Sequence, residues 1–294
     1  MSTAAPGRTE AARRPPRRGV VPVGLPAALA LGLTSLVGAA AFLWPFVVPA
    51  GTGATPSRDA PWLFVLLMAL MAAVVLAQLS SGGLDAKTVA VLGVLAAAGG
   101  ALRVLGAGTA GLEPMFFLLV LAGRVLGPGM GFLLGALAVL VGGFLTGGIG
   151  PWVPFQMFAA GWVALGAGCL PRASGWPERL LLAGYGLVAG LAYGVVINLW
   201  FWPFLATPGG ATSDGLSFVF GDPVLDNVRR YALFYLATSL GWDVPRGLLT
   251  AVLCLVGAGP VLATLRRALR RARFDAGAPS APAVAGPAER FTGR

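Results

Sequence analysis

The sequence contains no histidine and very few charged residues. Of its 294 residues, 11% are Asp, Glu, Lys or Arg and 57% are hydrophobic. Soluble domains carry about 25% charged residues, so the composition excludes an ordinary globular enzyme. Without histidine the chain lacks the commonest transition-metal ligand and the commonest general base, and it cannot build a catalytic triad that uses imidazole. We therefore predict no catalytic residue, no metal site and no cofactor.

Lysine and cysteine are also scarce. The single lysine, Lys87, precedes Thr88 but follows Ala86, so the Gly-Lys-Ser/Thr core of a phosphate-binding loop is missing. Any energy from ATP must therefore come from a partner protein. The two cysteines, Cys169 and Cys254, lie in apolar segments, and we interpret them as small hydrophobic residues without a disulfide.

What the sequence has instead is long apolar segments. Residues 125–171 contain no charged side chain, and one membrane-spanning helix needs about 20 apolar residues. These segments are continuous, whereas the strands of a membrane β-barrel are short and alternate in polarity. The sequence therefore predicts an all-α polytopic membrane protein. We expect eight spans, at about residues 25–48, 62–79, 88–105, 114–126, 130–146, 154–170, 180–203 and 244–265.

The net charge of +10 comes mainly from arginines near the two ends of the chain. These arginines flank membrane segments, so we expect no binding to nucleic acid, and the positive-inside rule places both termini in the cytoplasm. Arg124, near the end of a span, is expected to snorkel to the same side. We divide the chain into a disordered basic tail (1–20), a two-helix membrane extension (21–82), a six-helix core (87–266) and a second disordered basic tail (267–294).

The longest loop is predicted at residues 205–243, and its second part, 223–240, is amphipathic. Arg229 and Arg230 lie within that part, and a span there would move the C-terminal arginines to the outer side. We expect an interfacial helix on the outer side, with a span as the alternative.

Polar and aromatic residues are expected to gather at the outer side of the bundle. The turn 147–153, rich in Gly, Pro and Trp, separates two spans, and transport proteins often place binding groups at such breaks. Gln156 and Asn198 lie inside their spans, where an unpaired amide is costly. Aromatic walls with a few amides and carboxylates suit a flat or large polar small molecule. The candidate binding residues are Glu113, Trp152, Gln156, Asn198, Trp200, Trp202, Tyr231, Tyr235, Trp242 and Asp243.

Small residues recur at intervals of four, which lets helix backbones approach closely in a membrane. We expect most of these ridges to pack within the chain, and one is a candidate for contact with a partner. The ridges are Gly93, Ala97 and Ala101; Gly186, Gly190 and Gly194; Gly131 and Gly135; and Gly143 and Gly147.

Two other functions stay open from the residues alone. The spacing of Asp222 and Asp226 is similar to that of the metal-diphosphate aspartates of membrane prenyltransferases, although Pro223 lies between them and a second motif is missing. A self-sufficient secondary transporter is the other alternative, but such carriers usually place a carboxylate inside a span, and the span centres here are mostly free of ionisable groups.

From about Lys87 onward the chain resembles the substrate-binding (S) components of energy-coupling factor (ECF) transporters, which import vitamins. The resemblance rests on the order of four segments and on a core of six spans. The segments are the helix 87–103 with its Ala97 and Ala101 ridge, Glu113-Pro114-Met115-Phe116-Phe117, the helix-turn-helix 123–131, and 150–157 followed by Gly161-Trp162. The two spans before the core depart from the family pattern.

This resemblance implies a binding subunit of the bacterial cell membrane that captures a vitamin at the outer face and has no catalytic activity. It also implies a transmembrane (T) component and two cytoplasmic ATPases as partners, with Gly93, Ala97 and Ala101 at the contact with the T component. The nickel and cobalt members use an N-terminal histidine, which is missing here, so a metal ion is not expected as substrate. The long outer loop and the many aromatic residues favour a bulky ligand, cobalamin or a related corrinoid.

Overall fold

The computed structural model describes residues 24–43, 46, 65–66, 68–73, 76, 86–106, 109–205, 215–219 and 221–276. The tail predicted at 1–20 and most of the span predicted at 62–79 lie outside these residues. Within them the chain is helical and contains no strand. Each expected span outside 62–79 has a helix, which confirms the all-α class.

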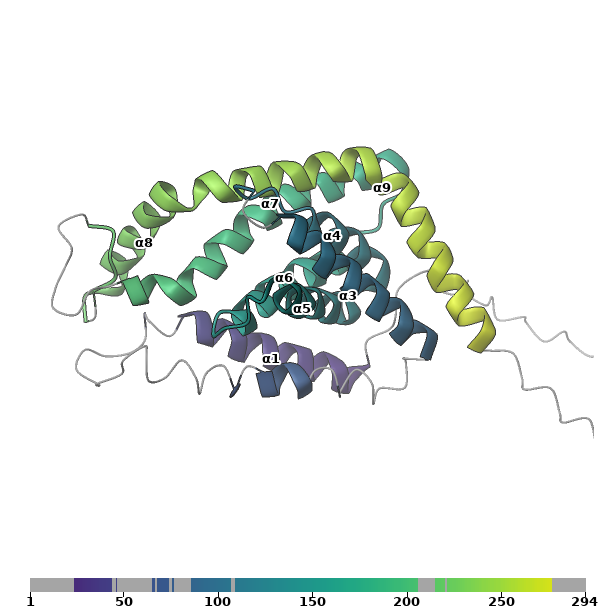
Figure 1. Ribbon diagram of the computed structural model, residues 1–294, viewed down its shortest axis with the longest axis horizontal. Coiled ribbons are helices and arrows are strands. Elements are labelled where there is room, and N and C mark those ends of the chain that lie inside the picture. The colour runs from purple at the N-terminus through teal and green to yellow at the C-terminus, as the bar shows by residue number, and fades with distance from the viewer. Residues whose placement is uncertain are drawn as a thin grey trace, which may run out of the picture.

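Six of these helices form the core. They are α3 (Ala86–Gly106), α4 (Met115–Leu126), α5 (Pro128–Thr146), α6 (Val153–Cys169), α7 (Gly175–Phe201) and α9 (Leu240–Ala276). Helix α1 (Leu25–Leu43) precedes the core, and the short turn η2 (Trp202–Leu205) and helix α8 (Val224–Thr238) lie between α7 and α9. Figure 1 shows α7 and α9 side by side along the length of the molecule, with α1 on the opposite side of the bundle.

Among the described residues, five helices are long and apolar enough to cross a membrane: α1, α3, α5, α7 and α9. The other two apolar helices, α4 and α6, have 12 and 17 residues. Helix α4 is short because Pro114 precedes it and Gly127 ends it, in a conformation (φ 91°) that suits glycine. All residues of α4 except Phe117 and Arg124 are buried, so this helix forms the centre of the bundle.

Close backbone contacts hold the core helices together. A Cβ atom on Gly123 would lie 2.1 Å from the carbonyl oxygen of Ala164, and one on Gly135 would lie 2.3 Å from that of Ala160. Neither position has room for a side chain, so α4 and α5 both touch the backbone of α6. Glycine at these sites permits the van der Waals packing that drives helix association in a bilayer.

The contact between α7 and α9 uses the predicted ridge of three glycines. A Cβ on Gly186 would meet Thr250 at 2.6 Å, and one on Gly190 would meet the Cα of Gly247 at 2.7 Å. A Cβ on Gly194 would overlap the carboxylate of Asp243. This ridge therefore packs within the chain.

Helix α1 packs beside the core on α6 and α7. The Nε1 atom of Trp162 donates a hydrogen bond to the hydroxyl of Ser35 at 3.1 Å. Phe42 contacts the rings of Phe155 and Trp162, with centroid distances of 5.1 Å and 5.6 Å. The other face of α1, which includes Leu29, is exposed.

Helix α8 agrees with the sequence expectation, whereas helix α9 extends beyond it. Helix α8 has 15 residues, which span roughly 22 Å, less than the hydrocarbon thickness of about 30 Å, and it is not among the helices that can cross a membrane. This length favours the expected interfacial helix over a span. Helix α9 continues to Ala276, inside the segment assigned to a tail, because its basic C-terminal part keeps burying leucines such as Leu269.

We predict that Gly190→Ala weakens the α7–α9 contact, because the new methyl group has no space beside Gly247. The apparent melting temperature of the detergent-solubilised protein should fall. The matched control is Gly184→Ala on the same helix, where no atom lies within 4 Å of the added carbon. Gly184→Ala should leave stability unchanged or raise it slightly, since alanine favours helix over glycine by about 0.5–1 kcal/mol. Equal effects of the two changes would contradict the packing role.

Candidate functional site

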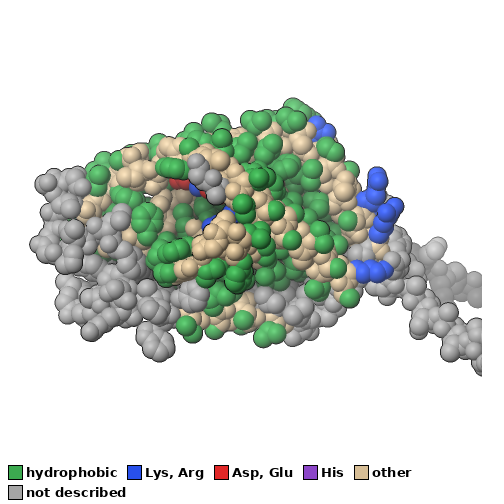
Figure 2. All heavy atoms as spheres, viewed as in Figure 1, with side chains coloured by type: hydrophobic (Ala, Val, Ile, Leu, Met, Phe, Trp, Pro, Cys, Tyr) green, Lys and Arg blue, Asp and Glu red, His purple; other side chains and the backbone are tan. Residues whose placement is uncertain are grey.

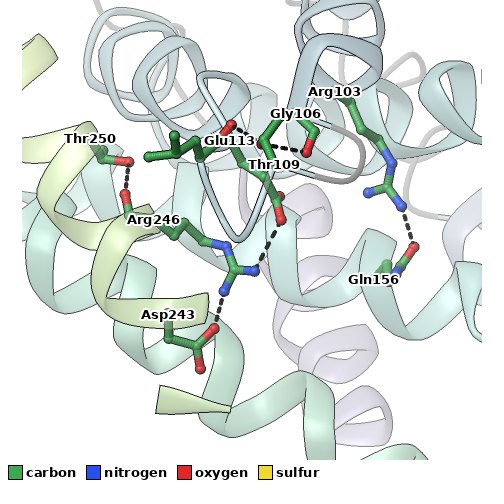
Figure 3. A network of polar contacts seen from close by, with 9 residues as sticks. Arg103, Gly106, Thr109, Glu113, Gln156, Asp243, Arg246 and Thr250 are labelled. Atoms are coloured by element: carbon green, nitrogen blue, oxygen red, sulfur yellow. Dashed lines mark hydrogen bonds and ion pairs between the residues drawn. The ribbon is translucent and has the colours of Figure 1, made fainter. Parts of the chain in front are cut away.

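A buried arginine, Arg246 of α9, is the centre of the polar site. Its side chain is 8% exposed, and its Nη2 atom donates to Oε1 of Glu113 at 3.0 Å. Its Nη1 atom donates to Oδ1 of Asp243, one turn earlier on the same helix. Figure 3 shows the guanidinium between the two carboxylates. Pairing from two sides stabilises a charge that would be costly alone in this environment.

Aromatic rings enclose the same guanidinium. Its central carbon lies 5.4 Å from the ring centre of Phe116 on α4 and 5.0 Å from that of Tyr193 on α7. Such cation–π contacts are favourable and keep water away from the charge. Arg246 thus joins α4, α7, α9 and the segment before α4.

Asp243 retains unused hydrogen-bonding capacity. Its Oδ1 atom pairs with Arg246, whereas its Oδ2 atom has no hydrogen-bond partner among the described residues, and neither has Nε of Arg246. The Tyr235 hydroxyl on α8 lies nearby but donates to the carbonyl of Leu191 at 3.4 Å. Burial, together with the charge of Asp243, raises the pKa of Tyr235, so its hydroxyl stays protonated. The Oδ2 atom lies against Gly194 of α7, and the Tyr235 hydroxyl lies beside the same carboxylate.

Asp243 and Arg246 line a pocket of about 430 Å³ between α7, α8 and α9. The volume lies within the range of small-molecule sites, roughly 300–1,000 Å³. Figure 2 shows a hollow on this face, with acidic and basic side chains visible inside it. The lining residues are Ile197, Asn198, Phe201, Phe234, Thr238, Ser239, Trp242, Asp243 and Arg246.

A second polar pair lies near the first. Nη2 of Arg103, at the end of α3, donates to Oε1 of Gln156 on α6 at 2.6 Å (Figure 3). A Cβ on Gly142 would lie 2.4 Å from Cδ of Arg103, so glycine leaves the space that this long side chain occupies. The predicted amide of Gln156 is therefore paired within the protein.

The structure brings some of the predicted residues together. Asn198, Trp242 and Asp243 line the pocket, Glu113 reaches it through Arg246, and Tyr235 lies beside Asp243. Asn198 is buried, whereas half of Trp242 is exposed at the pocket.

Two other predicted aromatic residues lie in a separate apolar cluster. Trp202 is fully buried against Phe218, Tyr231 and Phe234, and its Nε1 atom donates to the carbonyl of Leu216 at 2.8 Å. The hydroxyl of Tyr231 donates to the carbonyl of Val195. Trp202 and Tyr231 thus hold η2, α8 and the segment around Phe218 in place. Neither residue lines the pocket.

Two tryptophans lie away from the pocket. Trp152 is 39% exposed, and its Nε1 atom donates to the carbonyl of Gly148 at 3.1 Å, so it closes the turn between α5 and α6. Trp200 stacks on Phe155 with a centroid distance of 5.2 Å.

Sequence reasoning missed Arg246 and Arg103 as site residues. A signal was present for Arg246: Asp243 and Arg246 are three positions apart in an otherwise apolar segment, where ionisable residues tend to pair and to be functional. Their partners Glu113 and Gln156 are 133 and 53 positions away, and no local pattern links them.

At the other end of the bundle, Arg124 differs from its prediction. Instead of snorkelling, its side chain is 9% exposed, and its Nε atom pairs with Oε1 of Glu178 at 2.9 Å. Its Nη1 atom donates to the carbonyl of Leu170 at 2.7 Å. Arg266 reaches the same carboxylate oxygen of Glu178 at 2.6 Å. The arginine stays inside because a buried carboxylate and a helix-end carbonyl satisfy it there.

The described residues contain no group of three or more His, Cys, Asp or Glu side chains that could hold a metal ion. Asp222 pairs with Arg230 at 2.5 Å, and Asp226 lies 3.7 Å from Arg229. The two aspartates considered for a transferase are thus each engaged by an arginine of α8.

The fold defines a polytopic helical membrane protein with a pocket at one end of its bundle. A family model, described as ECF-type riboflavin transporter, S component, matches residues 83–235, a little more than half of the chain. The chain belongs to this family, which confirms the predicted resemblance to ECF S components but does not confirm the corrinoid ligand. It is thus a substrate-binding membrane subunit of an ECF transporter, which works with a T component and ATPases, and is not an enzyme. Comparisons with curated proteins and with solved structures returned no match.

We predict that Arg246→Gln destabilises the protein strongly, because Asp243 is then left buried and unpaired. Breaking a buried ion pair costs about 3–5 kcal/mol, which should appear as a large fall in apparent melting temperature. Asp243→Asn added to Arg246→Gln should recover part of the loss, since the unpaired charge is removed. Arg229→Gln, at a side chain that is 71% exposed, is the control and should have no effect. If Arg246→Gln matched that control, the buried network would not contribute to stability.

Proposed function

We propose that the chain binds riboflavin or a closely related flavin in the pocket between α7, α8 and α9. The observation that carries the proposal is the lining of that pocket, taken with the description of the family. Phe201, Phe234 and Trp242 supply aromatic walls, while Asn198 and Asp243 supply polar groups. An aromatic enclosure with a few polar groups suits a flat heterocycle.

The polar groups fit the edge of a flavin. Its pyrimidine ring presents an N–H between two carbonyl groups. Both polar residues line the pocket: the carboxylate of Asp243 can accept from an N–H, and the amide of Asn198 can donate and accept. The charges of Glu113 and Asp243 balance those of Arg246 and the nearby Arg103, which favours a neutral ligand over a charged one.

The size of the pocket favours a flavin over the corrinoid expected from the sequence. A corrinoid consists of a macrocycle with a nucleotide loop and has several times the bulk of a three-ring vitamin. A pocket of about 430 Å³ suits the smaller molecule. The apolar cluster around Trp202 also fills space that a bulkier ligand would need.

Binding of the T component is proposed at the exposed ridge of α3. Gly93, Ala97 and Ala101 are exposed, and no atom lies within 4 Å of a Cβ placed on Gly93. The opposite face of α3, which includes Ala96 and Gly99, is buried in the bundle. A smooth ridge of small residues permits another helix to approach closely.

The pocket end is proposed to face outward and the arginine-rich end to face the cytoplasm. The charges around Arg124 and Arg266 gather where α4 and α6 end and α7 begins. The positive-inside rule assigns that end to the cytoplasm. Both termini then lie inside, as the sequence analysis expects.

We predict that Trp242→Ala weakens riboflavin binding about tenfold or more, because the ligand loses an aromatic wall worth roughly 1.4 kcal/mol. Titration of the purified protein with riboflavin, followed by flavin fluorescence, measures the dissociation constant. Trp176→Ala is the matched control, since Trp176 is similarly exposed but lies at the other end of the bundle. Mass spectrometry of any co-purifying small molecule provides an independent check. Tight binding of cyanocobalamin without binding of riboflavin would contradict the proposal of a flavin ligand and support a corrinoid ligand instead.

We predict that Ala97→Leu abolishes uptake of the vitamin by the assembled transporter and leaves binding by the isolated subunit unchanged. The added bulk prevents close approach of the T component, while the pocket lies at other helices. Ala98→Leu, also exposed on α3 but on a different face, is the matched control and should retain uptake. A loss of binding in Ala97→Leu, or equal loss of uptake in both variants, would reject the ridge as the docking surface.

A further inference from the structure

The C-terminal part of α9 carries a cluster of basic residues that have no ion-pair partner among the described residues. Arg267, Arg270 and Arg271 are exposed, and no ion pair connects any of them to a described carboxylate. Their spacing of three and four positions places them on one face of the helix. Like charges at such spacing destabilise a helix by a few tenths of a kcal/mol per pair, so an external anion would stabilise this segment.

The opposite face of this segment is fixed to the core. Leu262 and Leu269 are buried, and Arg266 between them pairs with the buried carboxylate of Glu178. Packing of this face therefore fixes which side of α9 carries the three exposed arginines. Arg273 and Asp275 follow in the sequence and cancel in formal charge.

The length of α9 places this segment at the edge of the membrane. Its 37 residues span roughly 55 Å, whereas the hydrocarbon core is about 30 Å thick. Pro260 lies inside the helix, where a proline removes a backbone hydrogen bond and introduces a bend. Figure 1 shows α9 bending, with its C-terminal part lying across the end of the bundle.

Trp176 marks the membrane boundary at the same end. Its side chain is 57% exposed at the start of α7, as is typical of tryptophans at the headgroup level. Arg179 lies 5.8 Å from its ring and also beside Gly259, next to Pro260 of α9. Exposed Arg172 in the preceding loop adds a further positive charge. Glu178, the carboxylate of this region, is already shared by two arginines.

We propose that the face formed by Arg267, Arg270 and Arg271 binds the headgroups of anionic phospholipids in the adjacent leaflet. The positive charge, the fixed direction of the side chains and the position beside Trp176 fit phosphate groups at the membrane surface. Each basic residue at such a surface contributes about 1 kcal/mol to attraction. The interaction anchors the bent end of α9 to the membrane and does not depend on the ligand of the outer pocket.

Native mass spectrometry of the full chain tests this proposal with dioleoylphosphatidylglycerol and dioleoylphosphatidylcholine as probes. The protein should retain the anionic lipid in preference to the zwitterionic one, and added salt should weaken that preference. The triple variant R267Q/R270Q/R271Q should reduce the preference at least about tenfold, and R270Q alone about fivefold, the equivalent of about 1 kcal/mol. Glutamine has a helix propensity close to that of arginine, so α9 should still form in these variants.

The variant R8Q/R13Q/R14Q changes the net charge by the same amount and serves as the control. It should keep the lipid preference of the parent protein. Equal binding of the two lipids, or an equal loss in the control, would overturn the proposal and leave only general charge attraction. Displacement of the lipid by an equimolar amount of inorganic phosphate would overturn the assignment to a lipid headgroup.

Discussion

Helices inside a bilayer gain little from excluding water, so α7 and α9 depend on direct contact between their backbones. Gly186, Gly190 and Gly194 provide that contact, and at each position a side chain would strike α9. The third glycine also accommodates the carboxylate of Asp243. The packing of one helix pair thus sets where the charges of α9 lie, and with them the position of the pocket.

Buried charge is handled differently at the two ends of the bundle. At the pocket end one arginine, Arg246, is held by two carboxylates, Glu113 and Asp243. At the other end one carboxylate, Glu178, is held by two arginines, Arg124 and Arg266. Each cluster joins helices that are distant in sequence, because a charge in a medium of low dielectric constant must be paired. The first cluster lies at the pocket, whereas the second holds the basic end of α9 in place.

The family match covers only some of the helices that form the bundle and the pocket. The match ends at residue 235 and therefore excludes α9, whose Asp243 and Arg246 line the pocket. It also excludes α1, which packs beside α6 and α7 through Phe42 and Ser35. The family membership establishes the kind of protein. The proposed ligand site therefore includes residues of α9 that the family match does not cover.

The sequence by itself determined the membrane class, the positions of most spans and the family, because these depend on local hydropathy, on helix-ending Gly and Pro residues and on the order of short segments. It also identified Asn198, Trp242 and Asp243 as candidate site residues. Only the tertiary structure decided that Arg246 joins Glu113 to Asp243, that Trp202 and Tyr231 belong to a separate apolar cluster, and that Arg124 is buried with Glu178. Those pairings form between side chains far apart in the chain, and helix packing, which local patterns do not encode, brings them together.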